Sequence, residues 1–335
     1  MATVLLVGAG AVGVRAARQL LDTPHVDRLL VADRHGRRAR SMADSGGSRV
    51  EAVRLSTSDP IPPGVDVVAA AVPPGLDSAY AKQAIDAGVP FASASDDADA
   101  ISELGRLHGS ALAAGVVLAA GCGLAPGLSD VLAQHAAGAL DRVDEVHVSR
   151  AGAAGPACVS SVRRARREEP REWYEGVWRP VRRRGPELSW FPDPVGARDC
   201  ELVSSGTDLL VEAFPHASRL SVRFSEPPVR RRWSVPGRHT LDEEWGAARV
   251  EVWGVRGQAR EPIVYGVIER TAVAAGTVLA VAAATLAGLM PSAGVRSDVG
   301  GGTHGLGVLV ETTPFLAELA RRGVKAAVFE GVAVA

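Results

Sequence analysis

Lysine is scarce in this 335-residue sequence. Lys82 and Lys325 are the only two among 37 basic residues, so a mechanism that needs a lysine to form a Schiff base or to carry a proton has two candidates. The chain also has no excess of charge of either sign, because 38 acidic residues leave a formal net charge of -1. We therefore expect no nucleic-acid partner and predict small-molecule ligands.

Cysteine is scarce as well. Cys122, Cys158 and Cys200 form no CxxC pair, and their odd number leaves one of them unpaired in any disulfide scheme, which fits a reducing cytosol. The sequence has neither an HExxH motif nor a close pair of histidines. We therefore predict a cytoplasmic protein without a metal site.

Two apolar segments raise the question of a membrane. The first residues have no basic region before their apolar run, which is unlike a secretory signal peptide. Residues 271–295 carry no charge and are numerous enough to span a bilayer. Alanine, threonine and glycine dominate the run, however, and it contains no aromatic or basic anchor. This composition favours a buried, closely packed helix, and we predict no membrane association.

The first 125 residues alternate apolar runs with amphipathic segments. This alternation predicts a doubly wound, parallel Rossmann-type sheet with helices on both faces. The expected strands are residues 3–8, 28–33, 50–55, 65–72, 89–95 and 116–121. After about residue 139 longer strand-like runs follow one another without regular helices between them, which predicts a second α+β domain built on a largely antiparallel sheet. We place the domains at residues 1–125 and 126–265, and expect residues 266–335 to return to the first domain.

The stretch VGAGAVG follows the first expected strand and opens the first expected helix. In that context Gly8 permits the tight turn, Gly10 lets the backbone approach a pyrophosphate, and Gly13 lets helix and strand pack closely. Unpaired N–H groups at the start of the helix suit the phosphates. The other members of the predicted cofactor site in this turn are Ala9, Ala11 and Val12. The alternative is that the glycines serve the turn alone.

Asp33 ends the second expected strand, where an acidic side chain can bind the adenosine ribose hydroxyls. It favours NAD over NADP because a carboxylate repels a 2′-phosphate. Arg34 complicates this choice, since a guanidinium can hold that phosphate. Pro73 and Pro74 follow the fourth strand and are predicted to pack on the nicotinamide half of the dinucleotide, although a simple loop stop explains them equally well.

Candidate catalytic residues follow the fifth and sixth strands. Asp96 and Asp97 sit at the carboxyl edge of the sheet as possible substrate or proton partners, with a helix N-cap as the alternative. The stretch GCGLAPGLSD then predicts a glycine turn and a helix that begins near Pro126. In it Cys122 is a candidate catalytic residue and Gly123 a candidate substrate contact, whereas the alternative for Cys122 is a small buried residue.

Residues 163–184 form the one locally basic segment, with aromatic side chains among the arginines. Acidic residues interrupt it, so a solvated charged surface is favoured over a role in substrate binding, oligomerisation or nucleic-acid binding. Arg163, Arg164 and Arg198 are candidates for a clamp on a substrate carboxylate, and a surface position is the alternative for each.

In order along the chain, VGAGAVG, VADR, AVPPGLDSAYAKQAIDAGV, GCGLAPGLSDVLA and PFLAELARRGV resemble the saccharopine dehydrogenase-like oxidoreductases, which include saccharopine reductases and lysine 6-dehydrogenases. The similarity covers the first 135 residues and the last 70 better than the middle. Saccharopine reductases usually carry an acid where this chain has Ala125. The resemblance implies a dinucleotide-binding domain, a mixed α/β domain for substrate and dimerisation, and chemistry at a carbon–nitrogen bond.

These observations predict an NAD(P)-dependent oxidoreductase that transfers a hydride to or from an amino acid, amine or imine, as a homodimer. Reduction of a carbonyl and a dinucleotide-binding sensor without turnover remain alternatives. The sequence lacks the motifs of two other classes of dinucleotide enzyme. No Glu-Lys-Pro triplet, expected of sugar oxidoreductases of the glucose-fructose type, follows the fifth strand. None of Tyr80, Tyr174 and Tyr265 has a lysine four residues later, as a short-chain reductase would need.

Overall fold

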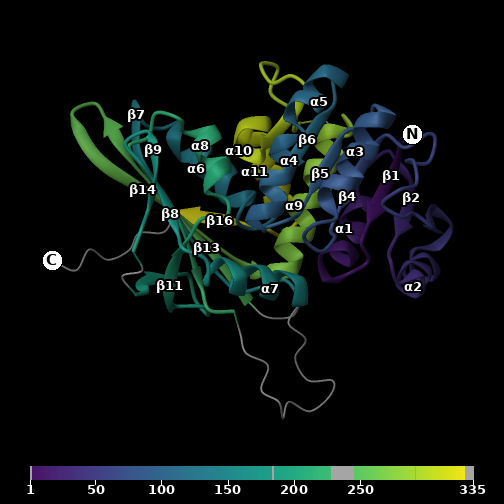
Figure 1. The fold of residues 1–335 in the computed structure, drawn as a ribbon, viewed down its shortest axis with the longest axis horizontal. Coiled ribbons are helices and arrows are strands. Elements are labelled where there is room, and N and C mark those ends of the chain that lie inside the picture. The colour runs from purple at the N-terminus through teal and green to yellow at the C-terminus, as the bar shows by residue number, and fades with distance from the viewer. Residues whose placement is uncertain (1, 183–184, 228–244, 291, 329–335) are drawn as a thin grey trace, which may run out of the picture.

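The computed structural model describes residues 2–182, 185–227, 245–290 and 292–328. The predicted α/β class is confirmed: the described residues form a parallel sheet and a second, largely antiparallel sheet, with helices packed on both (Figure 1). Residues 183–184 of the basic segment and residues 329–335 of the expected C-terminal unit lie outside this description.

The first sheet has the strand order β15-β6-β5-β4-β1-β2-β3, and all its pairings are parallel. Its strands are β1 (Ala2–Val7), β2 (Val26–Ala32), β3 (Val50–Val53), β4 (Val67–Ala70), β5 (Phe91–Ser93), β6 (Val117–Ala120) and β15 (Gly302–Gly305). Its helices are α1 (Ala11–Leu21), α2 (Gly36–Gly46), η1 (Gly47–Arg49), α3 (Asp77–Ala87), α4 (Ala98–Arg106) and α5 (His108–Ala114). The order reverses between β1 and β4, which is where doubly wound sheets bind ligands.

The second sheet has the order β10-β11-β12-β7-β13-β14-β16, and β8 joins β9 to β12. Its strands are β7 (Arg142–Ala151), β8 (Arg171–Tyr174), β9 (Val177–Pro180), β10 (Glu187–Trp190), β11 (Ala197–Val203), β12 (Arg219–Ser225), β13 (Trp245–Arg256), β14 (Ala259–Arg270) and β16 (Ala326–Val328). Within this second sheet, β12 and β7 are the only described strands that pair in parallel. Three helices belong to this part: α6 (Leu128–Ala137), α7 (Pro156–Ala165) and α8 (Thr207–Ala213).

Helix α6 begins two residues later than the sequence suggests. Gly127, just before it, has φ of +122°, which is not a helical conformation, so Pro126 belongs to the preceding turn. The middle of the chain also contains α7 and α8, where we expected no regular helices. Both helices contain short runs that could not be distinguished from strands by their apolar pattern alone.

The uncharged run forms α9 (Thr271–Leu286), which is buried along nearly its whole length, as predicted. It packs against α1, and Gly276 permits the close approach because a Cβ there would meet the backbone of Val12 and Ala16. No helix within the described ranges is long and apolar enough to cross a membrane.

The last part of the chain contacts both sheets. After α9 come β15, which extends the first sheet beside β6, then α10 (Leu306–Leu309) and α11 (Thr312–Arg321), and finally β16, which pairs with β14. The boundary placed at residue 265 falls inside β14. The domain limits remain predictions.

Candidate functional site

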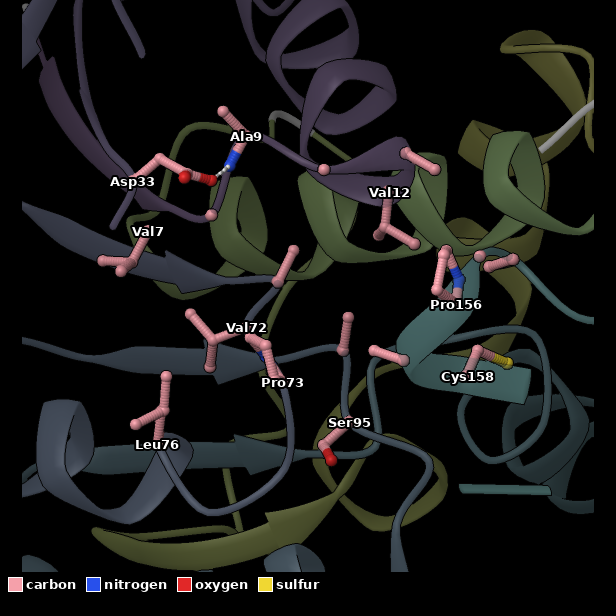
Figure 2. Close-up of a pocket in the computed structure, with 18 of the residues that line it drawn as sticks. Val7, Ala9, Val12, Asp33, Val72, Pro73, Leu76, Ser95, Pro156 and Cys158 are labelled. Carbon is pink, nitrogen blue, oxygen red and sulfur yellow. Dashed lines mark hydrogen bonds between the residues drawn. The ribbon is translucent and has the colours of Figure 1, made fainter. Parts of the chain in front are cut away.

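A cavity of about 560 Å³ lies between the carboxyl edge of the first sheet and the start of α7 (Figure 2). The turns after β1, β2, β4 and β5 form one side of it, and α7 of the second domain closes the other side. Its volume falls in the range of about 300–1,000 Å³ that small-molecule and cofactor sites occupy.

The glycine turn after β1 forms one end of this cavity. Gly8 has φ of +103°, and a Cβ there would collide with the carbonyl of Ala71. Gly13 packs directly against the Gly8 carbonyl, so it too has no room for a side chain. A Cβ on Gly10 would meet nothing within 4 Å, although this residue lines the cavity. The empty space above Gly10 is where a pyrophosphate would lie.

The remaining predicted residues of the turn also line the cavity. Ala9, Ala11 and Val12 are among its lining residues. Helix α1 begins at Ala11, and its N-cap residue Gly10 provides no side-chain hydrogen bond. The first N–H groups of α1 are therefore available to an anionic ligand.

Asp33 lines the same end of the cavity as the glycine turn. Its Oδ2 accepts a hydrogen bond from the Ala9 N–H at 2.8 Å (Figure 2). Its Oδ1 accepts one from the His35 N–H at 2.7 Å. The two bonds fix the carboxylate against the turn. Arg34 and Arg38 are exposed and line the same end of the cavity. The structure therefore places a carboxylate, which favours NAD, beside guanidinium groups, which favour NADP.

The middle of the cavity is apolar. Pro73 and Pro74 line it together with Val72 and Leu76, all in the loop that follows β4. Figure 2 shows Val72 and Pro73 on one side and Pro156 of α7 across from them. Proline has no backbone N–H, so this wall can contact a ring without offering competing donors.

Asp96 lines the other end, next to Ser95. Its Oδ2 is 2.7 Å from Nη2 of Arg150 and 2.9 Å from Sγ of Cys158. Arg150 is buried in β7, and its guanidinium also donates to the Ala125 carbonyl at 2.6 Å. The carboxylate of the first domain is thus bound by side chains of the second.

The Cys158 thiol is a hydrogen-bond donor at this end. Burial and the negative charge of Asp96 raise its pKa to about 12, although the positive charge of Arg150 acts in the opposite direction. The thiol is therefore protonated at neutral pH and is not activated as a nucleophile.

Asp97 does not line the cavity. Its position agrees with the alternative given above, in which it is the N-cap of a helix. Its Oδ1 accepts a hydrogen bond from the Ala100 N–H at 3.2 Å and caps α4, while its Oδ2 pairs with Arg164. Arg163, Arg164 and Arg198 do not line the cavity either. All three residues are exposed, so the structure does not bring them together at this cavity.

Cys122 is a core residue rather than a catalytic one. It is fully buried, its thiol donates to the Ala119 carbonyl at 3.6 Å, and burial raises its pKa. Gly123 is also buried, and its N–H donates to the Pro126 carbonyl. Neither residue lines the cavity, because the GCGLAPG turn folds back on itself behind the loop of Asp96. The turn contributes instead through the Ala125 carbonyl that binds Arg150.

Sequence reasoning missed Arg150 and the start of α7. The available signal was weak: Arg150 is a single charged residue near the end of an otherwise well-patterned strand, and Cys158 follows a Gly-Pro helix start. No group of three possible metal ligands exists within the described ranges.

The fold is that of known dehydrogenases. Residues 1–74 match the family model of shikimate/quinate 5-dehydrogenase, which therefore covers β1 to the loop after β4 and less than a quarter of the chain. Saccharopine dehydrogenase (L-Glu forming) from Saccharomyces cerevisiae superposes with a TM-score of 0.68 at 14% identity, over 98% of this chain and 100% of that one. This confirms the resemblance to saccharopine dehydrogenase-like enzymes at the level of the fold.

Two further solved structures share the fold. The DAP dehydrogenase of C. glutamicum, in complex with DAP, has a TM-score of 0.55 at 14% identity over 96% of this chain and 98% of that one. The amine dehydrogenase of Mycobacterium smegmatis has a TM-score of 0.54 at 13% identity over 92% and 96%.

Proposed function

We propose that the protein is an NAD(P)-dependent oxidoreductase that acts on a carbon–nitrogen bond of an amino acid, amine or imine. The observation that carries this proposal is the continuity of the cavity, which runs from Gly10 and Asp33 to Asp96. A dinucleotide with its pyrophosphate over Gly10 and its adenosine ribose at Asp33 directs its other half past Pro73 towards Asp96.

The residues present fit such a cofactor. The space above Gly10 accepts a phosphate, the exposed N–H groups of α1 offer donors, and Asp33 is held where an acceptor for ribose hydroxyls is needed. The nicotinamide supplies the hydride chemistry when it is bound. The protein then contributes an apolar wall at Pro73 and Pro74, which excludes water, and a polar end for the substrate.

The polar end favours a nitrogen-containing substrate. Asp96 offers a carboxylate oxygen that accepts a hydrogen bond from an N–H group, and Arg150 neutralises the charge of this carboxylate without filling the cavity. The names of the three proteins that share the fold refer to saccharopine, DAP and an amine, which supports the same direction.

We also propose NAD as the preferred cofactor, since Asp33 is fixed at the ribose position and repels a 2′-phosphate. We propose a homodimer on the basis of the resemblance, and a cytoplasmic location on the basis of the cysteine usage. Sedimentation of the purified full chain checks the homodimer.

Turnover with paired substrates tests the activity. Purified protein is incubated with NAD or NADP and a panel of amino acids and amines, and in the reverse direction with NADH or NADPH and the matching aldehydes or keto acids, with and without ammonia or an amine. We expect reduced cofactor to appear only with the amines, and to be consumed only when both carbonyl and amine are present. Consumption with the carbonyl alone contradicts the proposal and favours a carbonyl reductase; cofactor binding without turnover favours a sensor.

A further inference from the structure

Arg150 is a buried cation that joins loops of the first domain to the second. Its side chain is 3% exposed. The guanidinium donates to the Ala125 carbonyl and to Asp96 Oδ2, and it stacks 4.5 Å from the ring centre of Phe224. A buried charge is unstable without a partner of opposite charge, and Asp96 is the carboxylate that contacts this guanidinium.

Cys158 completes a triangle with these two residues. Its Sγ lies 2.9 Å from Asp96 Oδ2 and 3.1 Å from Arg150 Nη2. An ionised carboxylate only accepts hydrogen bonds, so the thiol donates its proton to Asp96. The Ser205 hydroxyl donates a hydrogen bond to the backbone carbonyl of Asp96, which also fixes the loop that carries Asp96.

The three contacts leave the two carboxylate oxygens of Asp96 in different situations. Oδ2 is bound by Arg150 and by Cys158, whereas no hydrogen bond from the described residues reaches Oδ1. The Asp96 side chain is 17% exposed and lines the cavity. With Oδ2 fixed, rotation of the carboxylate is restricted and Oδ1 is the oxygen that a ligand can use.

We propose that Arg150 and Cys158 are positioning residues, which fix the Asp96 carboxylate through Oδ2 so that Oδ1 binds the N–H group of the substrate. The identity of the substrate in this inference rests on the proposed function. The charge arrangement of the three residues does not, and it can be tested without any substrate.

Alkylation of Cys158 tests the arrangement. In the unaltered protein Asp96 disfavours the thiolate, so iodoacetamide modifies Cys158 slowly near pH 8. Asp96→Asn removes that negative charge and leaves Arg150 beside the thiol, so the thiolate becomes its counter-ion. We expect the alkylation rate of Cys158, measured by peptide mass analysis, to rise at least about tenfold, since one unit of thiol pKa changes the thiolate fraction tenfold.

Asp97→Asn is the matched control. It neutralises the adjacent carboxylate, which contacts Arg164 and not the thiol, and asparagine also serves as an N-cap. We expect the alkylation rate of Cys158 to stay within about twofold of that of the unaltered protein. Buried Cys122 and Cys200 report unfolding, because they become reactive only if the variant loses its core. Equal rates of Cys158 alkylation in folded Asp96→Asn and unaltered protein overturn the arrangement.

Steady-state kinetics then connect the arrangement to the substrate. Cys158→Ser retains a donor to Oδ2, and we expect kcat and KM within about threefold of the unaltered values. Cys158→Ala removes the donor, and we expect KM for the amine to rise about tenfold while the affinity for the dinucleotide is unchanged. Equal KM in the two variants overturns the positioning role of Cys158. Absence of amine turnover together with the expected alkylation pattern overturns the proposed function and leaves the charge arrangement intact.

Discussion

The two ends of the cavity are built in opposite ways. At the cofactor end, Gly8, Gly10, Gly13 and Asp33 all come from one strand–helix–strand unit, and backbone groups do most of the work. At the substrate end, Asp96 meets an arginine 54 residues away and a cysteine 62 residues away, and side chains make the contacts. The first end is a local structure; the second exists only when the two domains are packed together.

This difference separates what a substitution can affect. A change at the glycine turn should act mainly on cofactor binding, because backbone groups of the first sheet shape that turn. A change in the Asp96 cluster should act on the substrate and on domain packing, with the cofactor affinity preserved.

The largest expected effect is at Gly10. Gly10→Val should abolish dinucleotide binding, a loss of affinity of about a thousandfold or more, because the side chain fills the space of the pyrophosphate. The fold should persist, since a Cβ there meets nothing within 4 Å. Calorimetric titration with NADH and NADPH measures the loss.

Gly109→Val serves as the control for that variant, because Gly109 is also unobstructed but lies on the exposed surface of α5, outside the cavity. It should bind the dinucleotide with unaltered affinity. Retained affinity in Gly10→Val would mean that the glycine turn is structural only.

The next largest effect concerns Asp96. Asp96→Asn should lower kcat/KM for an amine substrate about a hundredfold, because the amide is a weaker acceptor and no longer balances Arg150. The dissociation constant of the dinucleotide should change less than about twofold. Single-turnover kinetics and calorimetry on the same preparation measure both quantities, and an equal loss in both would erase the distinction between the two ends.

The same contrast explains how far the sequence could be interpreted. The parallel sheet, the glycine turn and Asp33 were predictable because each depends on residues close together in the chain, and apolar periodicity and turn chemistry encode such local structure. Pro73 and Pro74 line the cavity for the same reason, since every strand of a parallel sheet ends at one edge, while their contact with the nicotinamide stays a prediction.

The substrate end could not be predicted in this way. Nothing local to Arg150 indicates that its guanidinium will meet Asp96, since that contact depends on how the two sheets pack. For Cys122 the sequence left a catalytic role and a small buried residue open, and the structure agrees with the second because the turn closes on itself and buries the thiol. Arg163, Arg164 and Arg198 attracted attention by charge alone, which says little about where a side chain points.

The third effect is on stability rather than on binding, and it concerns a buried carboxyl group next to the loop that carries Asp96. Asp77 is buried at the start of α3, Oδ1 accepts a hydrogen bond from Ser93, and Oδ2 has no partner among the described residues. The Ser93 hydroxyl also accepts from the N–H of Ser95, which precedes Asp96. Burial raises the pKa of Asp77 from 3.8 to about 7.

The sign of the pH effect follows from this shift. Between about pH 4 and pH 7 the unfolded chain ionises Asp77 while the folded chain keeps it protonated, so stability falls as the pH rises. Asp77→Asn should remove this dependence and raise the unfolding free energy by about 4 kcal/mol at pH 8, because a rise of the pKa from 3.8 to about 7 is worth that much, with little change at pH 4. Urea denaturation at both pH values measures it. Asp59→Asn, at an exposed carboxylate, should give no such gain, and a gain independent of pH in Asp77→Asn would contradict the buried protonated form.

The smallest effect is a change of preference at the cofactor end. Asp33→Ser removes the negative charge beside Arg34 and Arg38, and the ratio of the dissociation constants for NAD and NADP should shift about tenfold towards NADP. Since Asp33 also accepts the N–H groups of Ala9 and His35, a general weakening of both cofactors is expected, and only the ratio tests the assignment. Calorimetric titration with each cofactor gives that ratio. Arg34→Ser should move it in the opposite direction by weakening NADP alone. An unchanged ratio in Asp33→Ser would show that the carboxylate braces the glycine turn without contacting the ribose, and cofactor choice would then rest with the arginines.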